Sequence, residues 1–151
     1  MEIRIDDLRG PEIAALLDEH LADMYRISPP ESVHALDLEA LRAPDITFWT
    51  LWQARNLAGC IALKQHTPEF GEIKSMRTAN AFRGQGLAPK LLKHLIDEAR
   101  LRGIRRLNLE TGTEPFFEPA RRLYTAFGFT ECPPFATYIE DPNSLFMTRL
   151  I

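Results

Sequence analysis

The chain has 151 residues, of which 45% are hydrophobic and 26% are charged, a composition typical of a folded globular domain. Its formal net charge of −3 argues against a protein whose main task is to bind nucleic acid or anionic lipid. The two cysteines lack the spacing of metal ligands, so no metal is expected. The N-terminal stretch is acidic and no apolar run of about 18 residues occurs, so no membrane partner is expected. These features favour a single cytoplasmic domain over residues 1–151.

The first elements in chain order are a short strand and two helical segments. Residues 1–5 alternate as a strand does, and an amphipathic helix is expected behind Pro11. The apolar residues of that helix are Ile13, Leu16, Leu17, Leu21 and Met24. Ser28 and Glu31 have the spacing of a capping box with prolines between them, which predicts a second, shorter helix over residues 33–41.

The middle of the chain predicts an antiparallel meander followed by a long helix. Residues 46–54, 57–64 and 72–78 are rich in strand-forming side chains. Apolar residues then recur at helical spacing from residue 87 to residue 99, and Gly103 ends the pattern. The rest reads as a strand, a helix and two strands, over 106–110, 119–127, 129–132 and 144–150. One crossover in this order produces a pair of parallel neighbouring strands.

The segment from Met76 to Ala88 is the strongest candidate for a binding site. Gly84 and Gly86 allow the backbone to approach a ligand closely, and the N–H groups at the start of a helix favour a phosphate. No Gly-Lys-Ser/Thr motif follows and no βαβ unit precedes, which excludes a nucleoside triphosphatase loop and a Rossmann site. A tight turn that merely leads into the helix is the alternative.

Two motifs resemble those of the GNAT superfamily of acetyl-CoA-dependent N-acetyltransferases. Arg83-Gly84-Gln85-Gly86-Leu87-Ala88 is similar to the family signature Arg/Gln-x-x-Gly-x-Gly/Ala, and residues 120–129 are similar to its Ala-x-x-Leu-Tyr-x-x-x-Gly-Phe segment. The element order resembles that of a small bacterial single-domain member over nearly the whole chain. The resemblance implies an α+β fold: a mixed, mostly antiparallel sheet of six or seven strands, helices on both faces, and splayed fourth and fifth strands.

The same resemblance implies acetyl-CoA (coenzyme A) as co-substrate. The backbone of Met76, Arg77 and Thr78 would pair with the pantetheine arm, and an N–H near Arg77 would polarise the thioester carbonyl. The pyrophosphate would be held by Arg83, Gly84, Gln85, Gly86, Leu87 and Ala88. Glu118 stands where many members of the family carry an Asn that contacts the cofactor arm. This departure puts that contact in doubt for this chain.

Direct transfer to an amine needs one general base and one general acid. Tyr124 occupies the tyrosine of the second motif and is the expected acid, because an ordinary phenol holds its proton more tightly than a thiol. Glu72 is slightly favoured over Glu110 as the base, with water relaying the proton, and His66 is a third candidate. Packing of the tyrosine and pairing or solvation of the carboxylates are the structural alternatives.

The acceptor is expected to be a primary amine on a small molecule or peptide, and an amino acid, a polyamine, an antibiotic and a protein terminus all remain open. The first two helices and the C-terminal loop would contact it, through Tyr25, His34, Phe135, Tyr138 and Asn143. Each of these also fits a packing, surface or turn role. A non-catalytic acyl-CoA sensor or partner-binding module is the alternative function. No nucleic acid partner is expected, and the chain is interpreted as a monomer or homodimer.

Overall fold

The computed structural model describes all 151 residues, and seven strands form one sheet in the order β1-β2-β3-β4-β5-β7-β6. The strands are β1 (Glu2–Ile5), β2 (Ile46–Gln53), β3 (Asn56–Thr67), β4 (Phe70–Thr78), β5 (Arg106–Gly112), β6 (Thr130–Glu131) and β7 (Ser144–Leu150). All neighbouring strands are antiparallel except β4 and β5. The mixed, mostly antiparallel sheet with one parallel pair is therefore confirmed.

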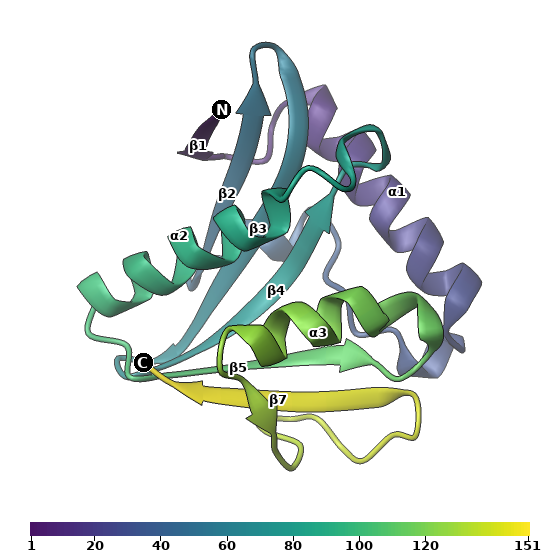
Figure 1. The fold of residues 1–151 in the computed structure, drawn as a ribbon, viewed down its shortest axis with the longest axis vertical. Coiled ribbons are helices and arrows are strands. Elements are labelled where there is room, and N and C mark those ends of the chain that lie inside the picture. Colours follow the sequence, from purple (N-terminus) through teal and green to yellow (C-terminus); the bar gives the residue numbers. More distant parts are fainter.

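Three α-helices cover the sheet: α1 (Pro11–Ile27), α2 (Leu87–Leu101) and α3 (Glu118–Ala126). Figure 1 shows α2 and α3 crossing the near side of the strands, with α1 away from them along the edge of the view. Trp49 of β2 packs in the core cluster with α2 and α3, whereas its neighbour Phe48 packs in the second cluster with α1. Strand residues alternate between faces, so both faces of the sheet are covered. No helix combines the length and apolar composition needed to span a membrane.

Helix α2 follows its sequence pattern closely. Its buried residues recur every three or four positions, namely Leu87, Leu91, Leu92, Leu95, Ile96 and Ala99. Gly86 precedes it with a positive φ of 73°, and Gly103 follows it with a φ of 84°. Glycine adopts this left-handed backbone without steric cost, so both ends of the helix are defined by residue type.

The second helix expected after Ser28 does not form. The structure has only two 3-10 turns there, Pro30–Ser32 and Ala40–Arg42. Ser28 is the C-cap of α1 with an extended backbone, and its Oγ donates to Glu114 Oε1 at 3.2 Å instead of capping a new helix. A residue before proline is held out of the helical region, and proline lacks an N–H, so the two adjacent prolines favour a turn over a helix.

Strands β4 and β5 pair over only part of their length. Residues Phe70–Ile73 pair with Arg106–Leu109, and beyond that the strands diverge, as Figure 1 shows. On the other edge of β4, the pairing with β3 shifts its register between Lys74 and Arg77, where Ser75 has a φ of 53°. Such a bulge re-aims the strand. No strand pairs with the β5-facing edge of Met76–Thr78, so the predicted splay is confirmed.

Candidate active site

Two adjoining cavities lie where β4 and β5 separate. The larger, of about 550 Å³, follows β4, the glycine loop and the start of α3, and is called the groove here. The smaller, of about 160 Å³, lies among α1, β4, β5 and the C-terminal loop, and is called the chamber. Both are lined by His20, Met24, Met76, Phe117 and Ala120. The shared residues make the two cavities one continuous site.

The glycine loop leaves the far end of the groove open to main-chain contact. Gly84 and Gly86 have φ values of 78° and 73°, and a Cβ at either would meet nothing within 4 Å. No side chain caps the first N–H groups of α2, so they are free to bind an anion. Apolar side chains line much of the remaining wall, including Phe82, Phe116 and Leu123. The groove thus offers an anion site joined to an apolar channel.

Most residues predicted to hold the cofactor line this groove. They are Met76, Arg77, Thr78, Arg83, Gly84, Gly86, Leu87 and Ala88, while Gln85 does not line it. Glu118 begins α3, is exposed, and pairs with Arg122 at 2.7 Å. The adjacent Pro119 lines the groove in its place.

Arg77 links α1 to β4. Its guanidinium is buried, with Nη2 at 2.7 Å from Glu19 Oε1 and at 2.7 Å from Asp23 Oδ2, both on α1. A buried charge needs such partners, because leaving it unpaired would cost several kcal/mol. The two ion pairs therefore hold this part of α1 against the wall of the site.

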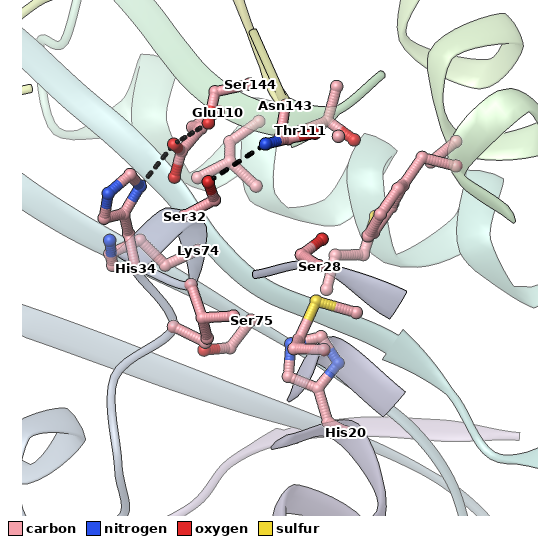
Figure 2. Close-up of a pocket in the computed structure, with 18 of the residues that line it drawn as sticks. His20, Ser28, Ser32, His34, Lys74, Ser75, Glu110, Thr111, Asn143 and Ser144 are labelled. Carbon is pink, nitrogen blue, oxygen red and sulfur yellow. Dashed lines mark hydrogen bonds and ion pairs between the residues drawn. The ribbon is translucent and has the colours of Figure 1, made fainter. Parts of the chain in front are cut away.

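Glu110 presents one free carboxylate oxygen at the chamber. Its Oε2 accepts from Ser144 Oγ at 2.8 Å and pairs with His34 Nδ1, as Figure 2 shows. Oε1 has no hydrogen-bond partner in the chain and is not enclosed. Nearby, Asn143 Nδ2 donates to Ser32 Oγ at 3.3 Å. One oxygen of Glu110 is thus fixed in place while the other is available to a ligand.

Glu72 is more deeply buried, and both of its oxygens are occupied. Oε1 lies 2.8 Å from His66 Nε2, and Oε2 accepts from Lys74 Nζ at 3.2 Å and from the Tyr138 hydroxyl at 2.6 Å. Burial, and then the charge of Glu72, raise the pKa of the Tyr138 phenol. That phenol therefore stays protonated and donates to Glu72. Glu72, Lys74 and Tyr138 all line the chamber, whereas His66 does not.

Tyr124 of α3 lies in the chamber wall beside Met76. Its hydroxyl lies 3.9 Å from Met76 Sδ and has no other hydrogen-bond partner in the chain. Burial raises the pKa of this phenol, so it carries its proton throughout the physiological range. The ring packs edge-on to Phe129 with 5.8 Å between centroids, which fixes its orientation. A hydroxyl whose only partner in the chain is a weak thioether acceptor is available to a ligand.

The predicted acceptor-binding residues divide into two groups. His34, Tyr138 and Asn143 line the chamber. Tyr25 does not, because it follows the cavity-lining Met24 on α1 and so points outward, where it is 57% exposed. Phe135 also lies outside both cavities and packs against Tyr138 and other aromatic rings, which makes it a support for the chamber wall.

Several lining residues were not predicted from the sequence, among them Ser28, Ser32, Lys74 and Ser144. His20 is the most informative of the missed residues. Burial, and then the charge of Arg77, lower its pKa from 6.5 to about 4. It continues the inner stripe of α1, one turn after the buried Leu16 and Leu17. A polar residue on an apolar stripe was the signal that could have found it.

Comparisons with known proteins agree with this geometry. The model of the Acetyltransferase (GNAT) family matches residues 13–129. The chain is 56% identical over 149 residues to an uncharacterized N-acetyltransferase, YsnE, of Bacillus subtilis (strain 168), covering 99% of each chain. It is 45% identical over 146 residues to an uncharacterized N-acetyltransferase, YedL, of Escherichia coli (strain K12), covering 97% of this chain and 92% of that one.

A solved structure gives the same result for the fold. A protein from Klebsiella pneumoniae, described as an acyl-CoA N-acyltransferase, superimposes with a TM-score of 0.80 at 28% identity, over 99% of this chain and 96% of that chain. The alignment covers all three helices and the split sheet, so the site lies within the shared architecture.

Proposed function

The chain belongs to the acetyltransferase (GNAT) family, and from that premise we propose that this enzyme moves the acetyl group of acetyl-CoA to the primary amine of a small molecule held in the chamber. One observation carries the proposal: an apolar groove that ends at uncapped main-chain N–H groups opens directly into a small polar chamber. A chamber of about 160 Å³ is below the roughly 300–1,000 Å³ of sites for drug-sized ligands. A compact acceptor therefore fits better than a folded protein surface.

The groove has the features that coenzyme A requires. Residues Gly84 to Ala88 supply free N–H groups for its diphosphate, and the unpaired edge of Met76–Thr78 supplies main-chain partners for its amide-containing arm. Acetyl-CoA supplies an acetyl group activated as a thioester. Transfer breaks that C–S bond and forms a C–N bond, while the amine loses a proton and the sulfur gains one.

Glu110 is the better placed of the two predicted bases. It lines the chamber and its Oε1 has no partner in the chain, so it can attract a positively charged amine and then accept its proton directly or through one water. His34 and Ser144 hold the other oxygen, which fixes the carboxylate. Glu72 remains a second candidate, but a proton would have to reach it through Tyr138 or water, because both of its oxygens are engaged.

Tyr124 is the proposed general acid. It lies beside Met76, at the passage between groove and chamber, where a thiolate would form. Its hydroxyl has no competing strong acceptor in the chain, and burial keeps it protonated. The same burial disfavours a free phenolate, so the proton is transferred as the thiolate develops rather than beforehand.

A thiol-release assay with a panel of small primary amines tests the proposal. We expect saturable release of coenzyme A with at least one amine, and an equal amount of N-acetylated product by mass spectrometry. Glu110→Gln should lower kcat by about 100-fold, the lower end of what general base catalysis contributes. The matched control is Glu131→Gln, on an exposed strand residue outside both cavities, and should leave the rate unchanged. Coenzyme A binding without acetylation of any amine would contradict the proposal and support an acyl-CoA sensor.

A further inference from the structure

His20 lies at the passage between groove and chamber. It is one of the residues that line both cavities, and Figure 2 shows its ring extending from α1 toward the chamber. His20 therefore borders the region where a cofactor in the groove and an acceptor in the chamber would meet. The position belongs to the inner stripe of α1, where its neighbours Leu16, Leu17 and Met24 are apolar. His20 is therefore a polar residue at an otherwise apolar position of the helix, and it faces the cavities.

The imidazole of His20 has unused hydrogen-bonding capacity. Nδ1 is buried without a hydrogen-bond partner in the chain. Buried polar groups without partners are rare in folded proteins, so the enclosed Nδ1 is a cost of placing a histidine at this position. Because Nδ1 is enclosed, Nε2 is the ring nitrogen that a ligand can reach, and the tautomer with its proton on Nε2 offers a free N–H.

The surroundings of His20 keep the ring uncharged and in place. Burial and the nearby guanidinium of Arg77 lower its pKa to about 4, so it is neutral near pH 7. Glu19 and Asp23 flank it on α1 and both bind Arg77 of β4, which fastens the helix at this turn. A neutral donor has an advantage here, because it does not repel a cationic amine that enters the chamber.

We propose that His20 donates a hydrogen bond from Nε2 to the carbonyl oxygen of the bound acyl thioester, so that α1 contributes a side-chain donor to the acyl-transfer site. The inference rests on the proposed function. When the amine attacks, negative charge develops on that oxygen, and a donor already in place stabilises the charge. The main-chain N–H groups near Arg77 are the other donors expected at this oxygen. His20 acts with them and not as a base, since a ring that is neutral at pH 7 with so low a pKa accepts protons weakly.

Two substitutions separate hydrogen bonding from packing. His20→Leu removes the donor and keeps an apolar side chain, whereas His20→Gln keeps an N–H. We expect kcat to fall about 100-fold in His20→Leu, the effect of losing one donor to a developing oxyanion. His20→Gln should recover at least tenfold of that loss, and the KM for acetyl-CoA should change less than threefold in both. The matched control is His94→Leu on α2, outside both cavities, which should keep the rate of the unsubstituted protein.

A spectroscopic readout keeps this inference separable from the proposed activity. The infrared carbonyl stretch of acetyl-CoA labelled with carbon-13 at the carbonyl should lie at lower frequency when bound to the unsubstituted protein than when bound to His20→Leu. Calorimetry with coenzyme A, which lacks the acetyl carbonyl, should give the same affinity for both proteins within twofold. A shifted carbonyl without any amine acetylation would retain the inference and refute the proposed function.

Three results would overturn the role of His20. The first is a kcat of His20→Leu within threefold of the unsubstituted value. The second is equal loss in the Gln and Leu variants, which would indicate packing alone. The third is an unchanged carbonyl frequency in His20→Leu, which would show that the ring does not contact the acyl oxygen.

Discussion

Alanine substitutions at Gly84, Gly86 and Gly103 can separate ligand binding from backbone strain. All three glycines have a φ between 73° and 84°, and a Cβ at each would meet nothing within 4 Å. Gly84 and Gly86 line the groove, whereas Gly103 follows the opposite end of α2. The 15 residues of that helix place the two ends roughly 22 Å apart at 1.5 Å per residue. Gly103→Ala is therefore a control with the same strain and no ligand contact.

The expected loss of stability is similar for the three variants. A side chain in the left-handed region costs about 1–2 kcal/mol. For a chain of this size, each kcal/mol lowers Tm by about 2–4 °C, so each variant should melt roughly 2–8 °C below the unsubstituted protein. With no steric clash to add, all three should fold.

Coenzyme A affinity should distinguish them. A methyl group at Gly84 or Gly86 would lie where the proposed site brings a diphosphate to the main chain, and a hydrogen bond to a charged group is worth about 1.5–3 kcal/mol. Loss of one such bond weakens binding by about tenfold or more. Isothermal calorimetry should show this loss for Gly84→Ala and Gly86→Ala and an unchanged Kd for Gly103→Ala. Equal affinity in all three variants would refute the assignment of the loop as the diphosphate site.

Three further predictions concern side chains of the chamber. Tyr124→Phe should lower kcat by about 100-fold in the thiol-release assay, with Tm unchanged because the hydroxyl makes only a 3.9 Å contact to sulfur; full activity would exclude it as the acid. Glu72→Gln should lower the unfolding free energy in urea by about 3 kcal/mol, since it leaves the Lys74 ammonium, on a side chain that is only 10% exposed, beside a neutral group; a loss below about 1 kcal/mol would show that the pair is solvated. The pKa of His20 is about 4 in the folded protein against 6.5 for an unperturbed histidine, so the unfolded state binds the proton at higher pH than the folded state does. The free energy of unfolding should therefore fall by up to about 3 kcal/mol as the pH drops from 6.5 toward 4. Urea titrations of His20→Gln should lack this part of the loss, and an identical pH dependence would contradict the low pKa.

The fold could be predicted largely because its signals are local. Periodicity identified α2 and the meander, and glycines at Gly86 and Gly103 marked the ends of the helix. The missing second helix shows the limit of such signals. Ser28 and Glu31 have the spacing of a cap, but the adjacent prolines and the contact of Ser28 with Glu114 decide the outcome. That contact joins residues 86 positions apart and leaves no trace in local sequence.

The place of the glycine loop on the groove was likewise predictable from a contiguous motif, whereas the contacts that build the chamber were not. His34 and Glu110 are 76 residues apart, and Tyr138 and Glu72 are 66 apart, yet each pair is in direct contact. A single sequence shows which residue types are present, but it does not show which residues far apart in the chain are in contact. The outward position of Tyr25 follows from the rotation of α1, which places Met24 toward the site and its neighbour toward solvent.

The divergence of β4 and β5 would couple the binding of the proposed cofactor to the stability of the fold. Strands β4 and β5 stop pairing after Ile73, so the amide and carbonyl groups of β4 that face β5 beyond this point have no partner strand. An incoming molecule can form hydrogen bonds with them. If the arm of coenzyme A pairs with these groups, it adds a reversibly bound strand to the sheet. Because it binds only the native state, it then raises the free energy of unfolding by mass action. At 100 times the Kd this gain is about 2.7 kcal/mol. The concentration of coenzyme A in the cell would then affect the resistance of the protein to proteolysis as well as its rate of turnover.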